Sequence, residues 1–285
     1  MRFGVFCFFF CKNYDRGDVM KYKILSAFLC VCSLIGSVSF SVSASEDTVF
    51  HWYCVRNHEH KQPIADANMR WIETYGGYYI DRVHGDDSQE KVVYLTFDAG
   101  YENGNVEKIL NVMKGEEVIG AFFVLGNLIQ KNPELIRRMA EEGHLVCNHT
   151  VRHKDMSKID DETVFCRELQ ELEQMYQEVT GKEMAKYYRP PEGTFDERSL
   201  RFASNLGYRT VFWSLAYADW DNQKQPDPEQ AKALLLKYMH NGAVILLHPT
   251  SRTNATILKD LIVTLKAQGF RFGSLDELCG NEMQG

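Results

Sequence analysis

The stretch that decides the expected fold runs from residue 92 to residue 100 and reads Val-Val-Tyr-Leu-Thr-Phe-Asp-Ala-Gly. An apolar run ends here in an acidic residue, Asp98, and a turn-forming glycine, Gly100. Short apolar runs bounded by turn residues are typical of buried strands. We therefore expect a strand over residues 92–97 that delivers Asp98 to its carboxyl end.

The sequence around this strand repeats the same pattern. Apolar runs alternate with amphipathic stretches, which predicts a parallel α/β fold whose strands are covered by helices. The expected strands are 92–97, 121–125, 144–147, 210–214, 243–247 and 270–273, and the expected helices are 106–114, 133–142, 160–180, 228–239 and 255–268. With about seven strands and no G-x-G-x-x-G after the first, the pattern favours a distorted (β/α) barrel over an open dinucleotide-binding sheet.

The chain is expected to have three parts. Residues 1–44 resemble a signal peptide, because Lys21 and Lys23 precede an apolar run that ends in Val42-Ser43-Ala44. We expect cleavage after Ala44. We also expect translation to start at Met20, because the charged and apolar parts of this pattern follow directly after it. An uncleaved membrane anchor is the alternative, since the apolar run is near spanning length. Residues 45–88 are expected to form an extension packed on the barrel, and residues 89–278 the catalytic domain.

Charge and cysteine content exclude some classes of protein. The 285-residue chain has a formal net charge of -7 and no Lys/Arg-rich run, which argues against nucleic-acid binding. The cysteines beyond the leader are scattered and form no C-x-x-C pair, so they predict neither a zinc knuckle nor a disulfide framework, although one disulfide stays open. They are Cys54, Cys147, Cys166 and Cys279.

Polar residues follow several of the expected strands, and in a parallel barrel the reacting groups gather at these ends. Asp98 is a candidate base, with a turn-forming Asp as the alternative. His149 and His153 are four residues apart, a spacing that on a helical turn places both rings on one face, where they can hold a divalent ion.

Two further candidates follow an apolar-aromatic segment and the expected strand 243–247. Arg189 precedes Pro190 and Pro191, which predicts a rigid rim from which its guanidinium orients a carboxylate, or else a structural loop-capping role. His248 ends a wholly apolar strand and is either a rim residue or a buried histidine. Asp219 and Trp220 are candidates for a charged partner and a sugar-stacking face.

Taken together and in order, these clusters resemble the polysaccharide deacetylase (NodB-homology, carbohydrate esterase family 4) family, whose motifs run T-F-D-D-G, H-[ST]-x-x-H, R-x-P, D-W and L-x-H. The resemblance covers residues 92–273. It implies a metal-dependent deacetylase with these roles: Asp98 as catalytic base, Arg189 orienting it, His248 as general acid, Asp219 tuning His248, and His149 and His153 as ligands of a divalent ion, most simply zinc.

One position departs from the family pattern. The second acid of T-F-D-D-G, a metal ligand in the family, is Ala99 here. The loop that follows is similar to the branch that acts on muramic acid during formation of the spore-cortex δ-lactam, where this ligand is also missing. The resemblance to this branch implies Tyr101, Asn103 and Trp220 as substrate-binding residues, and we expect Arg252 to meet the lactyl carboxylate, with Arg152 as the other candidate cation.

The function expected from this resemblance is removal of the N-acetyl group from N-acetylmuramic acid in peptidoglycan. Its partner would be a glycan strand already cut by an amidase, with no nucleic acid and no stable protein partner, in the cell envelope or spore cortex. The alternatives are a deacetylase of N-acetylglucosamine or chitin oligomers, and a catalytically silent sugar-binding protein suggested by Ala99.

Overall fold

The structure is a computed structural model that describes residues 48–56 and 59–280. One sheet of parallel strands forms its centre, in the order β11-β5-β6-β7-β8-β10-β4, with β12 also paired to β5. The strands are β4 (Gly77–Tyr78), β5 (Lys91–Ala99), β6 (Ala121–Val124), β7 (Leu145–Asn148), β8 (Tyr187–Tyr188), β10 (Arg209–Val211), β11 (Ala243–Leu247) and β12 (Phe270–Phe272).

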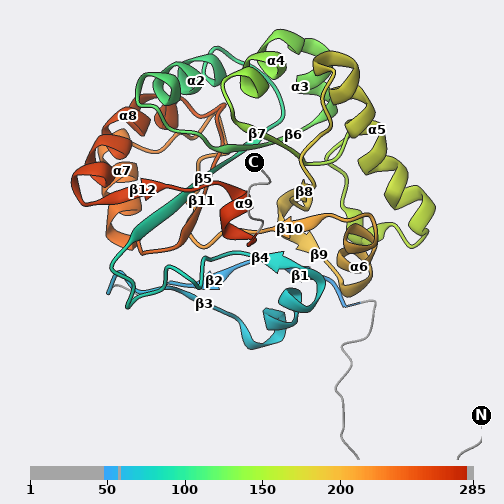
Figure 1. The fold of residues 1–285 in the computed structure, drawn as a ribbon, viewed down its shortest axis with the longest axis horizontal. Helices are drawn as coiled ribbons and strands as arrows, with labels where there is room; N and C mark the ends of the chain where they lie inside the picture. The colour runs from blue at the N-terminus through green and yellow to red at the C-terminus, as the bar shows by residue number, and fades with distance from the viewer. Residues whose placement is uncertain (1–47, 57–58, 281–285) are drawn as a thin grey trace, which may run out of the picture. The chain divides into compact units, whose positions relative to one another are not determined.

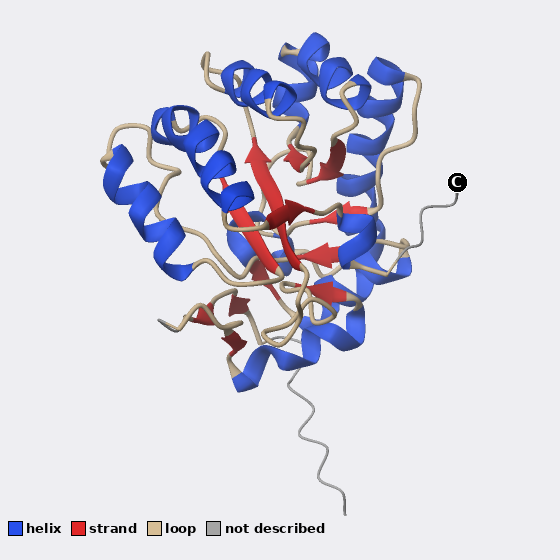
Figure 2. Cartoon of the chain, turned by 60° about the vertical axis from the view of Figure 1, so that its left-hand side comes forward, coloured by secondary structure: helices blue, strands red, loops and turns tan. Residues whose placement is uncertain are grey.

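The sheet curls until its ends approach each other. Ile80, just after β4, forms an isolated bridge with Ala243 of β11, and Leu215, beyond β10, bridges Ile245. Single bridges instead of a continuous ladder join the ends, so the barrel is distorted, as the alternation of segments predicted. Figure 1 shows the helices ringing the strands, and Figure 2 shows the strands inside that ring.

Eight α-helices lie in the described part of the chain. The helices that follow β5, β6, β7 and β11 cover the outer side of the barrel (Figure 1). The predicted helix 160–180 is observed at 162–180, and Gly181 ends it with φ 70°. The helices are α2 (Val106–Gly115), α3 (Gly126–Lys131), α4 (Pro133–Glu141), α5 (Glu162–Thr180), α6 (Glu197–Asn205), α7 (Pro228–Tyr238), α8 (Arg252–Ala267) and α9 (Leu275–Leu278).

Two predicted boundaries were wrong. Helix α8 begins at Arg252, three residues before the expected start, because the Ser251 side chain caps it by accepting from the Asn254 N–H at 3.1 Å. The strand expected over 210–214 ends at Val211. Beyond it the Phe212 N–H bonds back to Tyr78 of β4, and the chain then turns toward β11.

Alternation along β5 positions the site. Val93, Leu95, Phe97 and Ala99 belong to the core cluster that includes α2 and α8 residues, whereas Val92 and Tyr94 belong to the cluster inside the barrel. Because successive strand side chains point to opposite faces, Thr96 and Asp98 continue the inner set. The sheet therefore directs Asp98 into the mouth of the barrel and Ala99 toward the helices.

The residues before β5 pack on one side of the barrel, seen in blue and cyan in Figure 1. Strand β1 (Phe50–His51) pairs antiparallel with β9 (Thr194–Phe195), and β2 (Cys54–Val55) with β3 (Ile64–Ala65). A 3-10 helix, η1 (Ala67–Tyr75), follows, and two shorter ones are η2 (Met156–Lys158) and η3 (Pro191–Gly193). The Trp52 ring stacks on Phe212 with ring centroids 4.5 Å apart.

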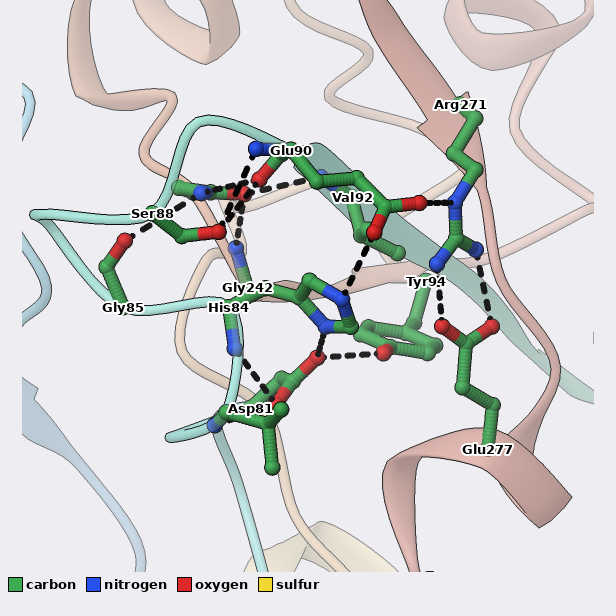
Figure 3. A network of polar contacts seen from close by, with 12 residues as sticks. Asp81, His84, Gly85, Ser88, Glu90, Val92, Tyr94, Gly242, Arg271 and Glu277 are labelled. Atoms are coloured by element: carbon green, nitrogen blue, oxygen red, sulfur yellow. Dashed lines mark hydrogen bonds and ion pairs between the residues drawn. The ribbon is translucent and has the colours of Figure 1, made fainter. Parts of the chain in front are cut away.

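A polar network ties the same segment to the opposite end of β5 (Figure 3). The buried Asp81 carboxylate accepts hydrogen bonds from the Tyr94 hydroxyl at 2.6 Å and from His84 Nδ1 at 2.5 Å. His84 Nε2 lies 3.2 Å from Glu90, which pairs with Arg271 of β12. The network therefore joins residues 81–90 to two strands of the sheet.

Two further findings concern the described residues only. Cys54, Cys147, Cys166 and Cys279 are free, so the disulfide that the sequence left open does not form among them. None of the helices within residues 48–56 and 59–280 combines the length and apolar character needed to cross a membrane. The expected leader, residues 1–44, lies outside the described residues.

Candidate active site

Asp98 and Arg189 form the centre of the site. Asp98 is the penultimate residue of β5, and its side chain is 10% exposed. Arg189 follows β8 and is completely buried, not on a rim as its sequence context predicted. Its Nη1 donates to Asp98 Oδ1 at 2.8 Å, while its remaining groups bond Thr96 Oγ1 and the carbonyls of residues 211 and 212. Arg189 thus holds one oxygen of Asp98 and leaves the other free to act.

The surroundings keep Asp98 ionised. Burial raises the pKa of Asp98 and the Arg189 guanidinium lowers it, and the net result is a pKa of Asp98 below its ordinary value. Burial lowers the pKa of Arg189 while Asp98 raises it, with a net lowering. An ionised carboxylate can accept a proton.

His149 and His153 are brought together by a loop and not by the expected helical turn. After β7 the chain passes through left-handed backbone at Thr150 (φ 72°) and His153 (φ 55°), which no helix contains. The Thr150 hydroxyl accepts from the His153 N–H at 2.9 Å and stabilises this turn. The two ring centroids lie 5.0 Å apart. The rings are therefore close together, as their spacing in the sequence predicted, but a loop and not a helical turn brings them there.

The chemistry of this pair suits a metal ion. His149 Nδ1 donates to the Arg189 carbonyl at 2.8 Å, which leaves its Nε2 lone pair free, and this nitrogen lies 3.6 Å from Asp98 Oδ2. Burial lowers the pKa of His149 to about 4, so the ring is neutral, as a ligand must be. Within the described residues, no group of three or more His, Cys, Asp or Glu side chains could hold a metal. The pair would therefore offer a metal ion two imidazole nitrogens.

His248 faces this group from β11. Its Nδ1 donates to Asp219 Oδ1 at 2.7 Å and its backbone N–H donates to Asp219 Oδ2 at 2.8 Å. The Asn254 amide holds the same Oδ2 at 2.5 Å. These contacts direct His248 Nε2 away from Asp219. Burial lowers the pKa of His248, but the hydrogen bond and charge of Asp219 outweigh it, so the pKa of His248 is raised and the ring retains its proton more readily.

These groups share one cavity of about 820 Å3, a volume in the usual range of ligand sites. Trp220, 62% exposed, stands beside His248 with ring centroids 6.4 Å apart. The cavity is lined by Arg56, Asp98, His149, His153, Glu192, Gly193, Trp213, Ala216, Tyr217, Ala218, Trp220, Leu246 and His248. A carboxylate, a metal-suited imidazole pair and an imidazole with a raised pKa lie around one opening, an arrangement suited to the hydrolysis of an amide.

Known proteins are similar to this one over most of the chain. The family model described as "Polysaccharide deacetylase" matches residues 85–211. Peptidoglycan-N-acetylmuramic acid deacetylase PdaA from Bacillus subtilis is 37% identical over 257 residues, covering 90% of this chain and 95% of PdaA. The chain belongs to the polysaccharide deacetylase family.

Solved structures and a second relative agree with this membership. The structure of Bacillus subtilis PdaA, a family 4 carbohydrate esterase, has a TM-score of 0.76 and 38% identity and covers 81% of this chain and 97% of its own. A family 4 carbohydrate esterase from Bacillus anthracis has a TM-score of 0.67 and 35% identity, covering 83% and 98%. A chitooligosaccharide deacetylase from a Bradyrhizobium species is 31% identical, covering 70% and 96%.

The other residues implied by the deacetylase motifs lie around the cavity and do not line it. The Tyr101 hydroxyl accepts from Asn222, and Asn103 donates to the Thr250 carbonyl at 2.8 Å, which ties its loop to the loop after His248. Arg252 is exposed at the start of α8 and is not among the lining residues. Arg152 pairs with Glu168 and Glu171 of α5.

Three lining residues of the deacetylase site were missed by sequence reasoning. Arg56 comes from the segment before the family match, and Trp213 lies just beyond the last residue of that match. Glu192 adopts left-handed backbone (φ 58°) between Pro191 and Gly193. At Gly193 (φ 64°), an added Cβ would approach the Trp213 ring to 2.7 Å, so the close contact requires glycine. The only available signal was the proximity of Glu192 to Arg189 in sequence.

Proposed function

We propose that this deacetylase removes the N-acetyl group from N-acetylmuramic acid in peptidoglycan. The observation that carries the chemistry is that an arginine-held carboxylate, Asp98, and a carboxylate-held imidazole, His248, line the same cavity. The choice of sugar is supported by the similarity to PdaA, whose name states this substrate. The resemblance of the loop after β5 to the branch that forms the spore-cortex δ-lactam further suggests a glycan strand cleared of peptide by an amidase, whose product amine would close the lactam.

A divalent ion, with zinc as the simplest candidate, would be held by His149 and His153. Neutral imidazoles with a free lone pair suit this ion. When bound, the ion would polarise the acetamide carbonyl and make water more acidic. Ala99 supplies no third protein ligand, so water would complete the coordination.

The residues of the chain would then divide the proton transfers between them. Asp98 takes a proton from water as the water oxygen bonds to the acetamide carbon. The C–N bond then breaks and His248 Nε2 gives its proton to the departing nitrogen. One water is consumed, and acetate and the sugar amine are released.

A backbone amide after Arg189 is suited to the oxyanion formed in between. Pro190 and Pro191 have no N–H, and the N–H of Gly193 bonds the Pro190 carbonyl at 3.0 Å. In this loop, the Glu192 N–H is therefore the group that we assign to the oxyanion. This role gives a reason for the left-handed backbone of Glu192.

Three further residues are assigned to substrate binding from their positions in the structure. Trp220 would stack on a sugar ring, because its large face is exposed at the cavity. Tyr101 and Asn103 would act further along the glycan, on the loop after β5. Arg252 remains the cation predicted from sequence for the lactyl group, but its place outside the cavity lining does not support that role.

The site of action would be the cell envelope or spore cortex. A signal peptide over residues 1–44, or an anchor in its place, would export the chain to its substrate.

A second candidate is deacetylation of N-acetylglucosamine in peptidoglycan or chitin oligomers. The similarity to the chitooligosaccharide deacetylase favours it, since the same catalytic group would serve. A silent sugar-binding protein is disfavoured because base, acid and both histidines are all in place.

Acetate release, combined with mass spectrometry of amidase-treated peptidoglycan, tests the proposal. The zinc-loaded protein should release acetate and leave muramic acid, not glucosamine, with a free amine or lactam. Asp98→Asn should slow release on the order of 10² to 10⁴-fold, because the base is lost. Loss of acetyl groups from glucosamine alone would favour the second candidate, and near-normal release by the Asp98 variant would contradict the mechanism.

A further inference from the structure

The segment before the family match forms one wall of the cavity. Alternate residues of this segment donate side-chain hydrogen bonds to one loop: Trp52 Nε1 to the carbonyl of residue 213 at 2.8 Å, Cys54 Sγ to that of residue 214 at 3.4 Å, and Arg56 Nη2 to that of residue 216 at 2.6 Å. This loop, residues 213–220, lines the cavity and carries Asp219. Three contacts in register therefore set the position of Arg56.

Arg56 is held in place but retains donors. Its guanidinium carbon lies 5.3 Å from the centroid of the Tyr238 ring, a cation–π contact, and the residue is exposed at the cavity. A guanidinium has five N–H donors in a planar fork, and the bond to residue 216 uses one. A held fork loses little further freedom when it binds a carboxylate in two-pronged fashion.

Other cations near the site are engaged or lie elsewhere. The guanidinium of Arg189 is completely buried and bonded to Asp98, Thr96 and backbone carbonyls. Arg152 is paired with two glutamates of α5. Among the described residues that line the cavity, Arg56 is the one basic residue of the lysine or arginine type.

The acidic residues of the cavity lining limit where a negatively charged part of a substrate can bind. Asp98 and Glu192 are both carboxylic residues of the same cavity. Asp98 is neutralised by Arg189, whereas a substrate carboxylate near Glu192 would meet a like charge at short range. An anionic substituent is therefore favoured near Arg56 and disfavoured near Glu192.

We propose that Arg56 binds the lactyl carboxylate of muramic acid and so selects this sugar over N-acetylglucosamine, which lacks that group. The assignment rests on the proposed function and replaces Arg252 in this role. Arg56 is a specificity residue and takes no part in bond breaking.

Ligand binding tests the assignment without turnover. Calorimetric titration in the Asp98→Asn background would compare an amidase-treated peptidoglycan tetrasaccharide with the N-acetylglucosamine tetramer. Arg56→Gln should weaken binding of the muramic ligand about tenfold to a hundredfold, as for loss of a charged hydrogen bond, and should leave the glucosamine tetramer within about twofold. Arg56→Lys should fall between, because it keeps the charge and loses the fork.

Controls separate this effect from misfolding. Arg70→Gln removes another exposed arginine of the same segment, which bonds the Ala65 carbonyl and not the cavity, and it should change neither affinity. Unfolding midpoints of all variants should match the parent within a few degrees.

Two outcomes would overturn the assignment: equal weakening on both ligands, or no change with Arg56→Gln while Arg252→Gln loses the preference. Failure of the proposed function is a separate result, seen when the wild-type protein releases acetate from neither glycan or only from glucosamine, whatever the binding ratios.

Discussion

Asp219 shows at the scale of single residues how a buried carboxylate raises the proton affinity of a neighbouring histidine. Its side chain is enclosed and receives hydrogen bonds from the backbone and ring of His248 and from Asn254. Burial alone would lower the pKa of His248. The charge of Asp219 reverses that effect, so His248 can act as an acid.

Asp219→Asn should therefore shift the pH dependence of deacetylation. A general acid works while protonated, so activity is retained below its pKa and lost as pH rises through it. Without the carboxylate charge the pKa of His248 falls, and the basic limb of kcat/KM should move to lower pH. Acetate release measured from about pH 5 to pH 9 would show it. Asp221→Asn, an exposed acid on the same loop, is the control, and an unmoved limb would mean that His248 is not the acid.

Ala99 is the second informative residue. It ends β5 next to Asp98 and is fully buried, with its methyl in the helix-facing core cluster. A carboxylate placed there loses its hydration unless it reaches a cation. Asp98 lies 3.6 Å from His149, so an ion held by His149 and His153 would be the compensating cation, provided that a carboxylate at position 99 turns from the helix-facing side to reach it.

Ala99→Asp should consequently make stability depend on metal. In the presence of chelator the variant should lose about 3 kcal/mol of unfolding free energy. Zinc should then raise its unfolding temperature more than it raises that of wild type or of Ala99→Asn, which has the same shape without the charge. Calorimetric scans with and without zinc would measure this. An equal zinc effect in all three proteins would show that residue 99 does not reach the ion.

At the scale of elements, the network around Asp81 explains how a short segment stays docked on the barrel (Figure 3). Tyr94 is on β5, Arg271 on β12, and both connect through charged groups to residues 81–90. Burial lowers the pKa of His84, but Asp81 and Glu90 raise it by more, so the pKa of His84 lies above its ordinary value. The link is therefore strongest when His84 is charged.

His84→Gln should destabilise the protein in a pH-dependent way. A group whose pKa is raised on folding contributes fully below its unfolded value, about 6.5, and this contribution is lost as pH rises through the folded value. The difference in unfolding free energy from wild type, measured in urea, should thus shrink from about pH 6 to pH 9. Tyr94→Phe should show a loss without this trend, because burial raises the pKa of its phenol far above that range. A constant difference for His84→Gln would indicate a neutral ring.

At the scale of the whole molecule, Trp52 connects stability to the shape of the cavity. It stacks on Phe212, and its backbone N–H and ring Nε1 bond the carbonyls of residues 193 and 213. Both carbonyls belong to cavity-lining residues. The segment before the barrel strands thus supports the site as well as the fold.

Trp52→Ala should lower the unfolding free energy by about 3–5 kcal/mol and raise KM for the glycan. Trp71→Ala is the matched control, since Trp71 lies in the same segment as Trp52 and its ring packs on Phe50 and Phe195. We expect it to reduce stability with KM unchanged, as measured by urea unfolding and acetate release. Parallel changes in KM for both variants would argue that general loosening, and not the cavity wall, is responsible.

Much of this protein was determined by the local pattern of its sequence. Apolar periodicity identified six of the eight sheet strands and five of the eight α-helices of the described residues, because burial requires it. Strand ends located Asp98, His149 and His248, because parallel strands deliver side chains to one rim. The family followed from the order of these motifs.

Only the tertiary structure decided the rest. The loop conformation at His153, the full burial of Arg189, the position of Arg252 outside the cavity and the presence of Arg56 in it all depend on contacts between segments far apart in the chain. Arg56 lies 160 residues from the carbonyl that positions it, and no periodicity in sequence records such a contact. Local patterns report which residues are buried, whereas the choice of partners is made when the whole chain packs.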